Sequence, residues 1–481
     1  MLITYSKEKK HYKLLCNKDS LLTVLLIFLS CLFFSPVTAV ISIILTYSLI
    51  FFGILKKHYL FVLALLLYSS GYWGEINNLV IPGVGGYLYL VSWFFLAISI
   101  AKDFNFRLPK SKLAIFILSY LTIMIILALV NNILNSEVFD STHLAFIKKD
   151  LTFIMITVAV IACYPLFNMK DFVRLANILN ITWVVANIIL IVTTLGVEPH
   201  KASPSYIFTP LSYDEFQNFY FPLTLFLLFS KGGGSKFIAL LLFIGHLFIM
   251  YNCGLGSQLI IVIVLLSLIY FILFFKKLSL IVFCLILFLI MNGNLGNSKI
   301  VASENKQNDI FINKTNAIIN SATGDINNIP WSPRVRVIEI VNFFDKGILD
   351  ISFGQIIGGY ITESKLKFNF QFSPSVEDDF SAEQIKSGRF YSLHNISSVL
   401  LKFGVLFYLM LFYIFILLLK YFKKNSKFDY FNLGIVIVAV SFFNFYWTWR
   451  ISFLLIILIF CIAKEMGSVV IKRIDTYNQV N

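Results

Sequence analysis

Apolar runs of about twenty residues recur along most of the chain, and no other feature constrains its fold as strongly. Hydrophobic residues make up 58% of the sequence and charged residues 13%, whereas soluble domains are about half apolar and about one quarter charged. A helix of this length crosses a bilayer core about 30 Å thick. The sequence therefore predicts an all-α polytopic membrane protein, in which helices pack against one another within lipid.

The runs predict about fourteen transmembrane helices. Their expected cores are residues 21–35, 38–55, 58–73, 84–101, 113–131, 151–168, 175–195, 216–230, 237–252, 257–275, 278–292, 396–419, 431–448 and 451–466. One long polar segment separates the helices. The chain is therefore expected to consist of an N-terminal bundle at 1–291, a large loop with short helices at 292–395, and C-terminal helices with a tail at 396–481.

Lysine and arginine gather in alternate short loops, which is typical of loops that face the cytoplasm. These are the N-terminal residues, 56–57, 102–112, 170–174, 231–236, 276–277, 420–427 and the C-terminal Lys-Arg pair. The opposite short loops hold Lys148, Lys149, Lys201 and Arg450. Both termini are therefore expected in the cytoplasm, and the 292–395 loop is expected on the outer side of the membrane.

Several function classes have no support in the sequence. The formal charge of +14 is spread over loops and forms no basic stripe with interleaved aromatics, so nucleic acid is not an expected partner. CxxC, HExxH and GxxxxGK[ST] patterns are absent, and we therefore expect no metal, no cofactor and no ATPase activity. None of the six cysteines lies in the 292–395 loop, which would keep its shape without disulfides.

The stretch "WSPRVRVIEIVNFFDKGI" predicts a helix within the large loop, with Ser332 as N-cap and Pro333 in the first turn. Arg334 and Arg336 open this helix. Arginine binds phosphate through two parallel hydrogen bonds, and a helix N-terminus favours an anion. Alternatively, the helix lies on the membrane surface and both arginines are ordinary surface residues. Apolar residues recur at helical spacing at Val337, Ile338, Val341, Phe344 and Ile348.

The stretch "YSLHNISSVLLKFGVLFYLM" places His394 and Asn395 directly before a membrane helix. Histidine titrates near neutral pH, so His394 could act as a general base at the lipid surface. The alternative is an interfacial histidine that caps the helix. Lys402 lies further into the same helix, where it could extend its ammonium outward or line a polar cavity.

Other polar residues on the outer side are further candidates. Arg450 lies among aromatics between the last two helices, where it could anchor the chain at the interface or bind a lipid phosphate. Asp214 and Glu215 are alternative bases, and His143 and His200 are the other outer histidines.

Inside the predicted helices, His246 and Gln258 are explained adequately by hydrogen bonds between helices.

Three stretches, in this order, resemble the region shared by bacterial O-antigen polymerases and O-antigen ligases: "SPRVRVIEIVNFF", "FGQIIGGY" and "HNISSVLLKFGVLFYLMLFYIF". In that family an arginine opens an amphipathic helix, a glycine pair follows, and His-Asn precedes a helix that contains a glycine. The matching residues are Gly354, Gly358 and Gly359 at the glycine pair, and His394, Asn395 and Gly404 in the His-Asn element. Lys402 departs from the family, which often has an acidic residue there.

The resemblance implies glycosyl transfer from an oligosaccharide linked to undecaprenyl pyrophosphate, at the outer leaflet of the bacterial cytoplasmic (inner) membrane. It implies His394 as the base and Arg334 or Arg336 as the group that stabilises the leaving pyrophosphate. Asn395, Lys402, Arg450, Gly358, Gly359, Asp214 and Glu215 become candidate substrate-binding residues. Membrane lipid and a chain-length-determinant protein are the implied partners.

Three functions remain open at this point. The first is an O-antigen polymerase, and the second is an O-antigen ligase that delivers polymer to lipid A-core. The third is a polysaccharide flippase or transporter. The long outer loop and the lack of repeated helical halves in the sequence argue against it.

Overall fold

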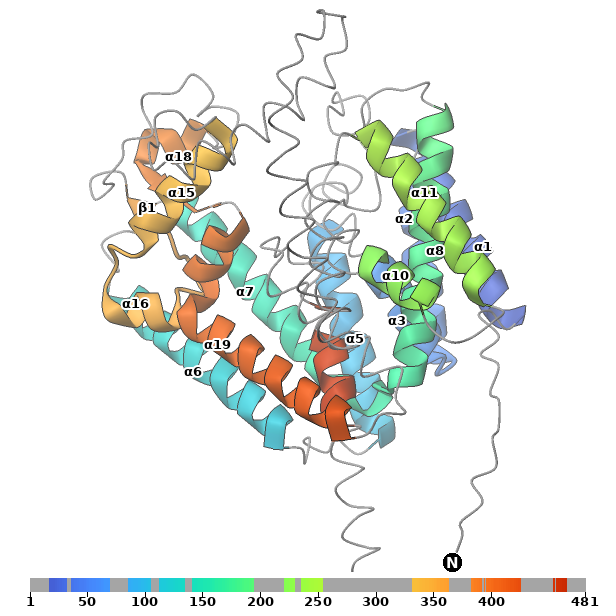
Figure 1. Cartoon of the computed structure of the whole chain (residues 1–481), viewed down its shortest axis with the longest axis horizontal. Helices are drawn as coiled ribbons and strands as arrows, with labels where there is room; N and C mark the ends of the chain where they lie inside the picture. The colour runs from blue at the N-terminus through green and yellow to red at the C-terminus, as the bar shows by residue number, and fades with distance from the viewer. Residues whose placement is uncertain are drawn as a thin grey trace, which may run out of the picture.

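The computed structural model describes residues 17–32, 36–69, 85–104, 112–134, 141–193, 220–229, 235–253, 331–362, 382–391, 393, 395–424, 453–454 and 456–464. The described part is mostly helical (Figure 1). The spans expected at 257–275, 278–292 and 431–448 lie outside it.

The helices before the large loop overlap the spans expected there. They are α1 (Asn17–Cys31), α2 (Pro36–Leu55), α3 (Tyr59–Ser69), α5 (Gly85–Phe104), α6 (Lys112–Leu134), α7 (Ser141–Ala162), the short 3₁₀ helix η4 (Tyr164–Leu166), α8 (Met169–Thr193), α10 (Phe221–Phe229) and α11 (Ser235–Cys253). Residues 453–454 and 456–464 are helical near the C-terminus.

Four helices in the described ranges are long and apolar enough to cross a membrane. They are Val37–Leu55, Tyr87–Phe104, Met169–Thr193 and Ser397–Ile414. Large apolar side chains on these and neighbouring helices are exposed, including Leu21, Val37 and Phe237, as expected for surfaces that face lipid. The chain is therefore a multi-pass membrane protein.

Small residues allow the membrane helices to approach closely. A Cβ added to Gly245 of α11 would lie 2.5 Å from a methyl carbon of Val184 in α8, and one added to Gly53 of α2 would lie 2.6 Å from a methyl carbon of Val62 in α3. Helices α1, α8, α10 and α11 pack together on the right of Figure 1, while α5 contacts α7. Most buried apolar side chains of both groups belong to one continuous core.

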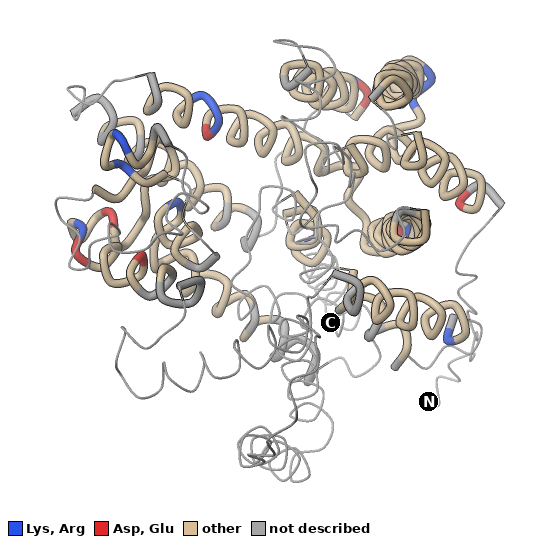
Figure 2. Tube along the Cα trace, turned by 90° about the horizontal axis from the view of Figure 1, so that it is seen from above, with Lys and Arg blue, Asp and Glu red and all other residues tan. Residues whose placement is uncertain are grey.

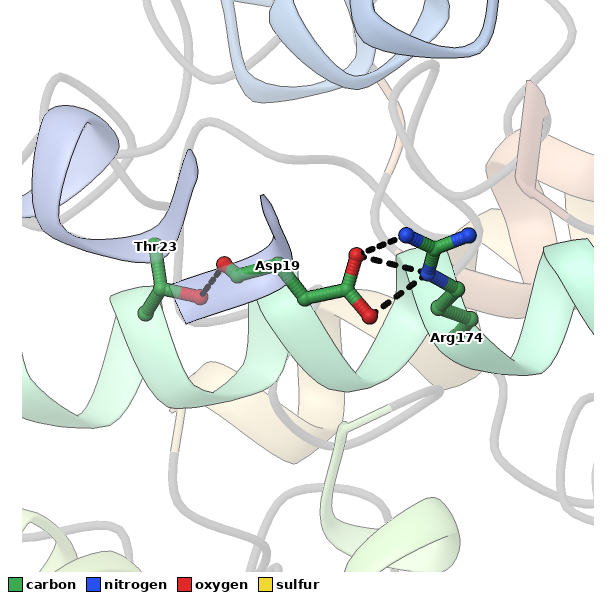
Figure 3. A network of polar contacts seen from close by, with 3 residues as sticks. All are labelled: Asp19, Thr23 and Arg174. Carbon is green, nitrogen blue, oxygen red and sulfur yellow. Dashed lines mark hydrogen bonds and ion pairs between the residues drawn. The ribbon is translucent and has the colours of Figure 1, made fainter. Parts of the chain in front are cut away.

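Polar side chains link the helices across this core. The buried Asp19 of α1 accepts hydrogen bonds from the Arg174 guanidinium of α8, and the Thr23 hydroxyl donates to the Asp19 carbonyl (Figure 3). His246 of α11 lies 3.1 Å from the Thr224 hydroxyl of α10 and 3.0 Å from the Asn180 side-chain oxygen of α8. The expectation that His246 makes packing hydrogen bonds between helices is confirmed, whereas Gln258 lies outside the described residues.

The large loop contributes α15 (Trp331–Phe343), α16 (Ile348–Phe353), β1 (Ile361–Thr362), α18 (Ala382–Ser387) and β2 (Arg389–Phe390), and α19 (Asn395–Lys424) follows it. The two strands pair antiparallel, with Ile361 opposite Phe390, so the all-α expectation misses a short two-stranded sheet. These elements lie together on the left of Figure 1, around the first turns of α19. Helix α15, the two strands and α19 share a small apolar cluster that consists of Val335, Ile338, Ile361, Phe390, Leu393 and Leu401.

The predicted loop helix exists, but its buried face differs from the expectation. The helix begins at Trp331, so Ser332 lies inside it and is not the N-cap. Phe344 and Ile348 lie beyond its end and are exposed, because the chain turns after Phe343. The buried face is formed instead by Val335, Ile338, Glu339 and Asn342.

Two expected loops are partly helical. Helix α7 begins at Ser141, ten residues before the expected span, and therefore includes Lys148 and Lys149. Both lysines lie over aromatic rings, Lys148 over Tyr87 and Lys149 over Phe146, which explains how charges are accommodated in this helix. In the large loop, the sequence stretch "SPSVEDDFSAEQ" predicts a solvated loop, but its last residues begin α18 and Gln384 is buried.

Candidate functional site

The three stretches that carry the family resemblance converge at the start of α19. Helices α15 and α16 both pack against α19. Val335, which stands between Arg334 and Arg336, belongs to the same apolar cluster as Leu393, which precedes His394. Leu401 of α19 completes this contact. Segments about sixty residues apart in sequence therefore meet in one place.

Helix α19 is broken at Gly404, where φ is 69° and ψ is 179°. Two carbonyls beside the break accept hydrogen bonds from outside the helix. The Gln355 backbone N–H donates to the Leu401 carbonyl at 2.7 Å, and the Tyr120 hydroxyl donates to the Phe403 carbonyl at 2.9 Å. A helix break within lipid is tolerated when the freed backbone groups find partners in the protein, as they do here. The break separates a first segment of α19, residues 395–403, from the remainder.

A turn formed by residues 354–359, here called the glycine turn, fits into this break. Gly354 has a φ of 72°, and a Cβ added there would lie 2.5 Å from the Gly404 backbone nitrogen. A Cβ on Gly404 would collide with the Ser352 carbonyl oxygen. Both positions require glycine because of the positive φ and because the two backbones touch.

The buried Asp150 of α7 connects the glycine turn to α19. Its Oδ2 accepts a hydrogen bond from the Gly358 backbone N–H at 2.8 Å and another from the Lys402 ammonium at 2.5 Å. The side chains of Lys402 and Asp150 are 18% and 6% exposed. Lys402 is thus paired inside the protein, and neither of the two expectations for it named this partner.

Aromatic side chains pack beside the first turn of α7. Tyr391 stacks on Phe146 with ring centroids 4.3 Å apart, and its hydroxyl lies 3.1 Å from Nδ1 of the buried His143. The Gln384 side-chain oxygen accepts from the Tyr391 backbone N–H at 2.8 Å. Tyr360, next to the glycine turn, packs against both His143 and Tyr391.

Cations surround Tyr360. The Lys346 ammonium lies 5.8 Å from its ring centroid and the Arg389 guanidinium carbon 5.7 Å. Lys346 also donates to the Gln355 side-chain oxygen at 3.0 Å. Figure 2 shows basic and acidic positions close together on the left, the side where Figure 1 places α15, α16 and α18. The region therefore places two cationic groups beside one aromatic ring.

The structure describes some of the predicted site residues in full, some only in their backbone, and others not at all. Lys402 and Gly358 meet through Asp150, and Gly359 sits tightly against the Gln355 backbone, where an added Cβ would lie 2.5 Å from the carbonyl oxygen. The predicted site residues whose helical backbone is described, without their side chains, are Arg334, Arg336 and Asn395. The predicted residues outside the described part are His394, Arg450, Asp214 and Glu215.

Sequence reasoning missed Asp150, because residues 148–150 were expected in a loop. The signal that could have found it is Lys402 itself, since a charge within a membrane helix is usually paired with an opposite charge on a neighbouring helix. Within the described ranges, no group of three or more His, Cys, Asp or Glu residues gathers that could hold a metal ion.

Comparisons with known proteins return no match: neither a protein-family model, nor a curated protein, nor a solved structure resembles this chain closely enough to be reported.

Proposed function

We propose that the chain is an O-antigen polymerase, which joins oligosaccharide repeats carried on undecaprenyl pyrophosphate. One observation carries the proposal: the arginine-bearing helix α15, the glycine turn and the start of α19, which together hold the family-like stretches, pack into one unit. The packing supports the proposal because segments that form one active site must lie next to one another.

In the proposed reaction His394 accepts the proton of an acceptor sugar hydroxyl. The hydroxyl oxygen forms a bond to the anomeric carbon of the donor sugar, the bond from that carbon to the pyrophosphate oxygen breaks, and undecaprenyl pyrophosphate leaves. Arg334 or Arg336 stabilises the negative charge that develops on the leaving group. Asn395, Gly358, Gly359 and Arg450 belong to the proposed substrate site, and Asp214 and Glu215 are the alternative bases.

Lys402 has a changed role in this proposal. Since its ammonium is paired with Asp150, it supports the site and is not a free cation for substrate.

The proposal also covers how the chain crosses the membrane and which side each segment faces. About fourteen helices span the bacterial cytoplasmic membrane, both termini lie in the cytoplasm, and the 292–395 loop faces the outer side. The reaction then takes place at the outer leaflet, where both lipid-linked substrates meet the loop.

The lipopolysaccharide of a strain that lacks the gene tests this function. A polymerase defect leaves a single repeat attached to the core, and the full ladder returns when the gene is restored. Unsubstituted core with lipid-linked polymer retained would indicate a ligase instead. Unsubstituted core with only single lipid-linked repeats would indicate a flippase, and an unchanged ladder would refute all three functions.

A further inference from the structure

We propose that Asp150 is a positioning residue whose carboxylate fastens both the glycine turn and the first segment of α19 to α7. We take this fastening to position His394, which directly precedes that segment in the sequence, and this consequence rests on the proposed function. The fastening itself does not rest on it, because it follows from the hydrogen bonds alone.

The arrangement of donors separates this role from that of an ordinary ion pair. One oxygen of Asp150 receives two donors from different segments, a backbone N–H of the glycine turn and the ammonium of Lys402. The Lys402 ammonium neutralises the charge of the Asp150 carboxylate. The Gly358 N–H carries no net charge, so its hydrogen bond serves to hold the glycine turn against α7. An acceptor at position 150 is therefore required even when both charges are removed.

Two further polar contacts hold the glycine turn. The Gln355 N–H bonds to the Leu401 carbonyl, and Lys346 bonds to the Gln355 side chain, so both stay within the loop and α19. Two side chains of the N-terminal bundle reach this region: the Tyr120 hydroxyl of α6 donates to the Phe403 carbonyl, and Asp150 of α7 accepts from Gly358 and Lys402. Of these two, Asp150 is the one that contacts the glycine turn. Asp150 thus ties the loop and α19 to the rest of the membrane domain.

Single substitutions cannot test this role, because each would leave one unpaired charge in a buried place. Two neutral double variants can. Asp150→Asn with Lys402→Met removes both charges but keeps a side-chain oxygen that accepts from the Gly358 N–H. Asp150→Leu with Lys402→Met removes the charges and also the acceptor. The two variants differ mainly in the contact under test.

Hydrogen–deuterium exchange of the purified full-length protein measures that contact directly. Peptides covering residues 354–360 should exchange at the wild-type rate in the Asn–Met variant. They should exchange about ten- to a hundredfold faster in the Leu–Met variant, since a buried donor has lost its acceptor. A matched control is Asp19→Asn with Arg174→Met, which neutralises the ion pair between the buried Asp19 of α1 and Arg174 of α8 (Figure 3). Both helices lie on the other side of the molecule in Figure 1, so this variant should leave the peptide unchanged.

Polymer formation is read in parallel at equal protein level. The Asn–Met variant should retain wild-type polymer, and the Leu–Met variant should lose it at least about tenfold. Equal exchange in the two variants, or full polymer from the Leu–Met variant, would overturn the positioning role. Loss of polymer from a well-folded Asn–Met variant would also overturn it, because the charge would then be what matters.

A further variant covers the case in which the Leu–Met protein does not accumulate. The swapped pair Asp150→Lys with Lys402→Asp keeps both charges but removes the acceptor from α7. The shorter aspartate side chain at position 402 cannot place its carboxylate where the Asp150 oxygen lies. The 354–360 peptide should again exchange faster, and wild-type protection would contradict the proposal. If exchange behaves as expected while even the wild-type protein makes no polymer, the fastening stands and the proposed function falls.

Discussion

At the scale of single residues, Arg334 and Arg336 stand on either side of the buried Val335 near the start of α15. Arg334 is closer to the helix N-terminus, where the helix dipole adds to its own charge. We expect Arg334→Lys to reduce polymer at least about tenfold, because lysine keeps the charge but cannot bind a phosphate through two parallel hydrogen bonds. The amount and length of polymer at equal membrane protein level measure the effect.

Arg336→Lys is the matched variant and should be milder. If Arg336→Lys is instead the more severe of the two, the pyrophosphate contact belongs to Arg336.

The structure also changes the interpretation of His143. From the sequence it is simply another outer histidine, but in the structure it is buried against Tyr360 and Tyr391. Replacing it would leave a cavity beside these rings and remove the hydrogen-bond partner of the Tyr391 hydroxyl, so it would destabilise the site without any role in catalysis. A histidine control for His394 must therefore come from elsewhere, and His58, which is exposed in the turn between α2 and α3, is suitable.

At the scale of elements, the break in α19 depends on glycine. Gly404→Ala should destabilise the protein by about 1–2 kcal/mol from the left-handed backbone alone, and by more because the methyl group meets the Ser352 carbonyl. The midpoint of thermal unfolding in detergent should fall accordingly.

Gly347→Ala provides the control for this prediction. Gly347 is the N-cap of α16 with a φ of −63°, and an added Cβ there meets nothing within 4 Å. Only the N-cap preference for glycine over alanine is lost, so the free energy of unfolding should change by less than about 1 kcal/mol. An unfolding midpoint for Gly404→Ala equal to that of Gly347→Ala would contradict the described packing of the glycine turn.

The elements also show what a sequence can and cannot predict. Apolar runs locate most helices, because a bilayer-spanning helix needs a long run of one composition. They misplace the start of α7, since its first turns contain two lysines, of which Lys148 lies over Tyr87 of α5 and Lys149 over Phe146 of α7 itself. The stripe from Val337 to Ile348 follows helical spacing, yet the chain turns after Phe343 and tertiary contacts choose a different face. Pairs such as Asp150 and Lys402 depend on contacts between distant segments, which spacing alone does not encode.

At the scale of the whole molecule, charge distribution predicts which side each loop faces. Alkaline phosphatase fused at Ser321 or Ser375 should be active, because both positions belong to the loop expected outside the membrane. A fusion at Ser235, at the start of α11 in a lysine-bearing loop, should be inactive. Cytoplasmic behaviour at both Ser321 and Ser375 would remove the outer-leaflet site together with the orientation.

In the proposed function, this chain itself transfers sugar from a lipid-pyrophosphate donor at the site where α15, the glycine turn and α19 meet. A reconstituted reaction tests this: the purified protein, in liposomes, receives undecaprenyl-pyrophosphate-linked repeat units, and the products are followed on a gel. The wild-type protein and His58→Ala should build a ladder without nucleotide sugar or added metal. His394→Ala should be slower by about 10²–10⁴, the contribution typical of a positioned base. A full ladder from His394→Ala would contradict the role of His394 as the base, and no ladder from the folded wild-type protein would contradict the proposed transfer reaction.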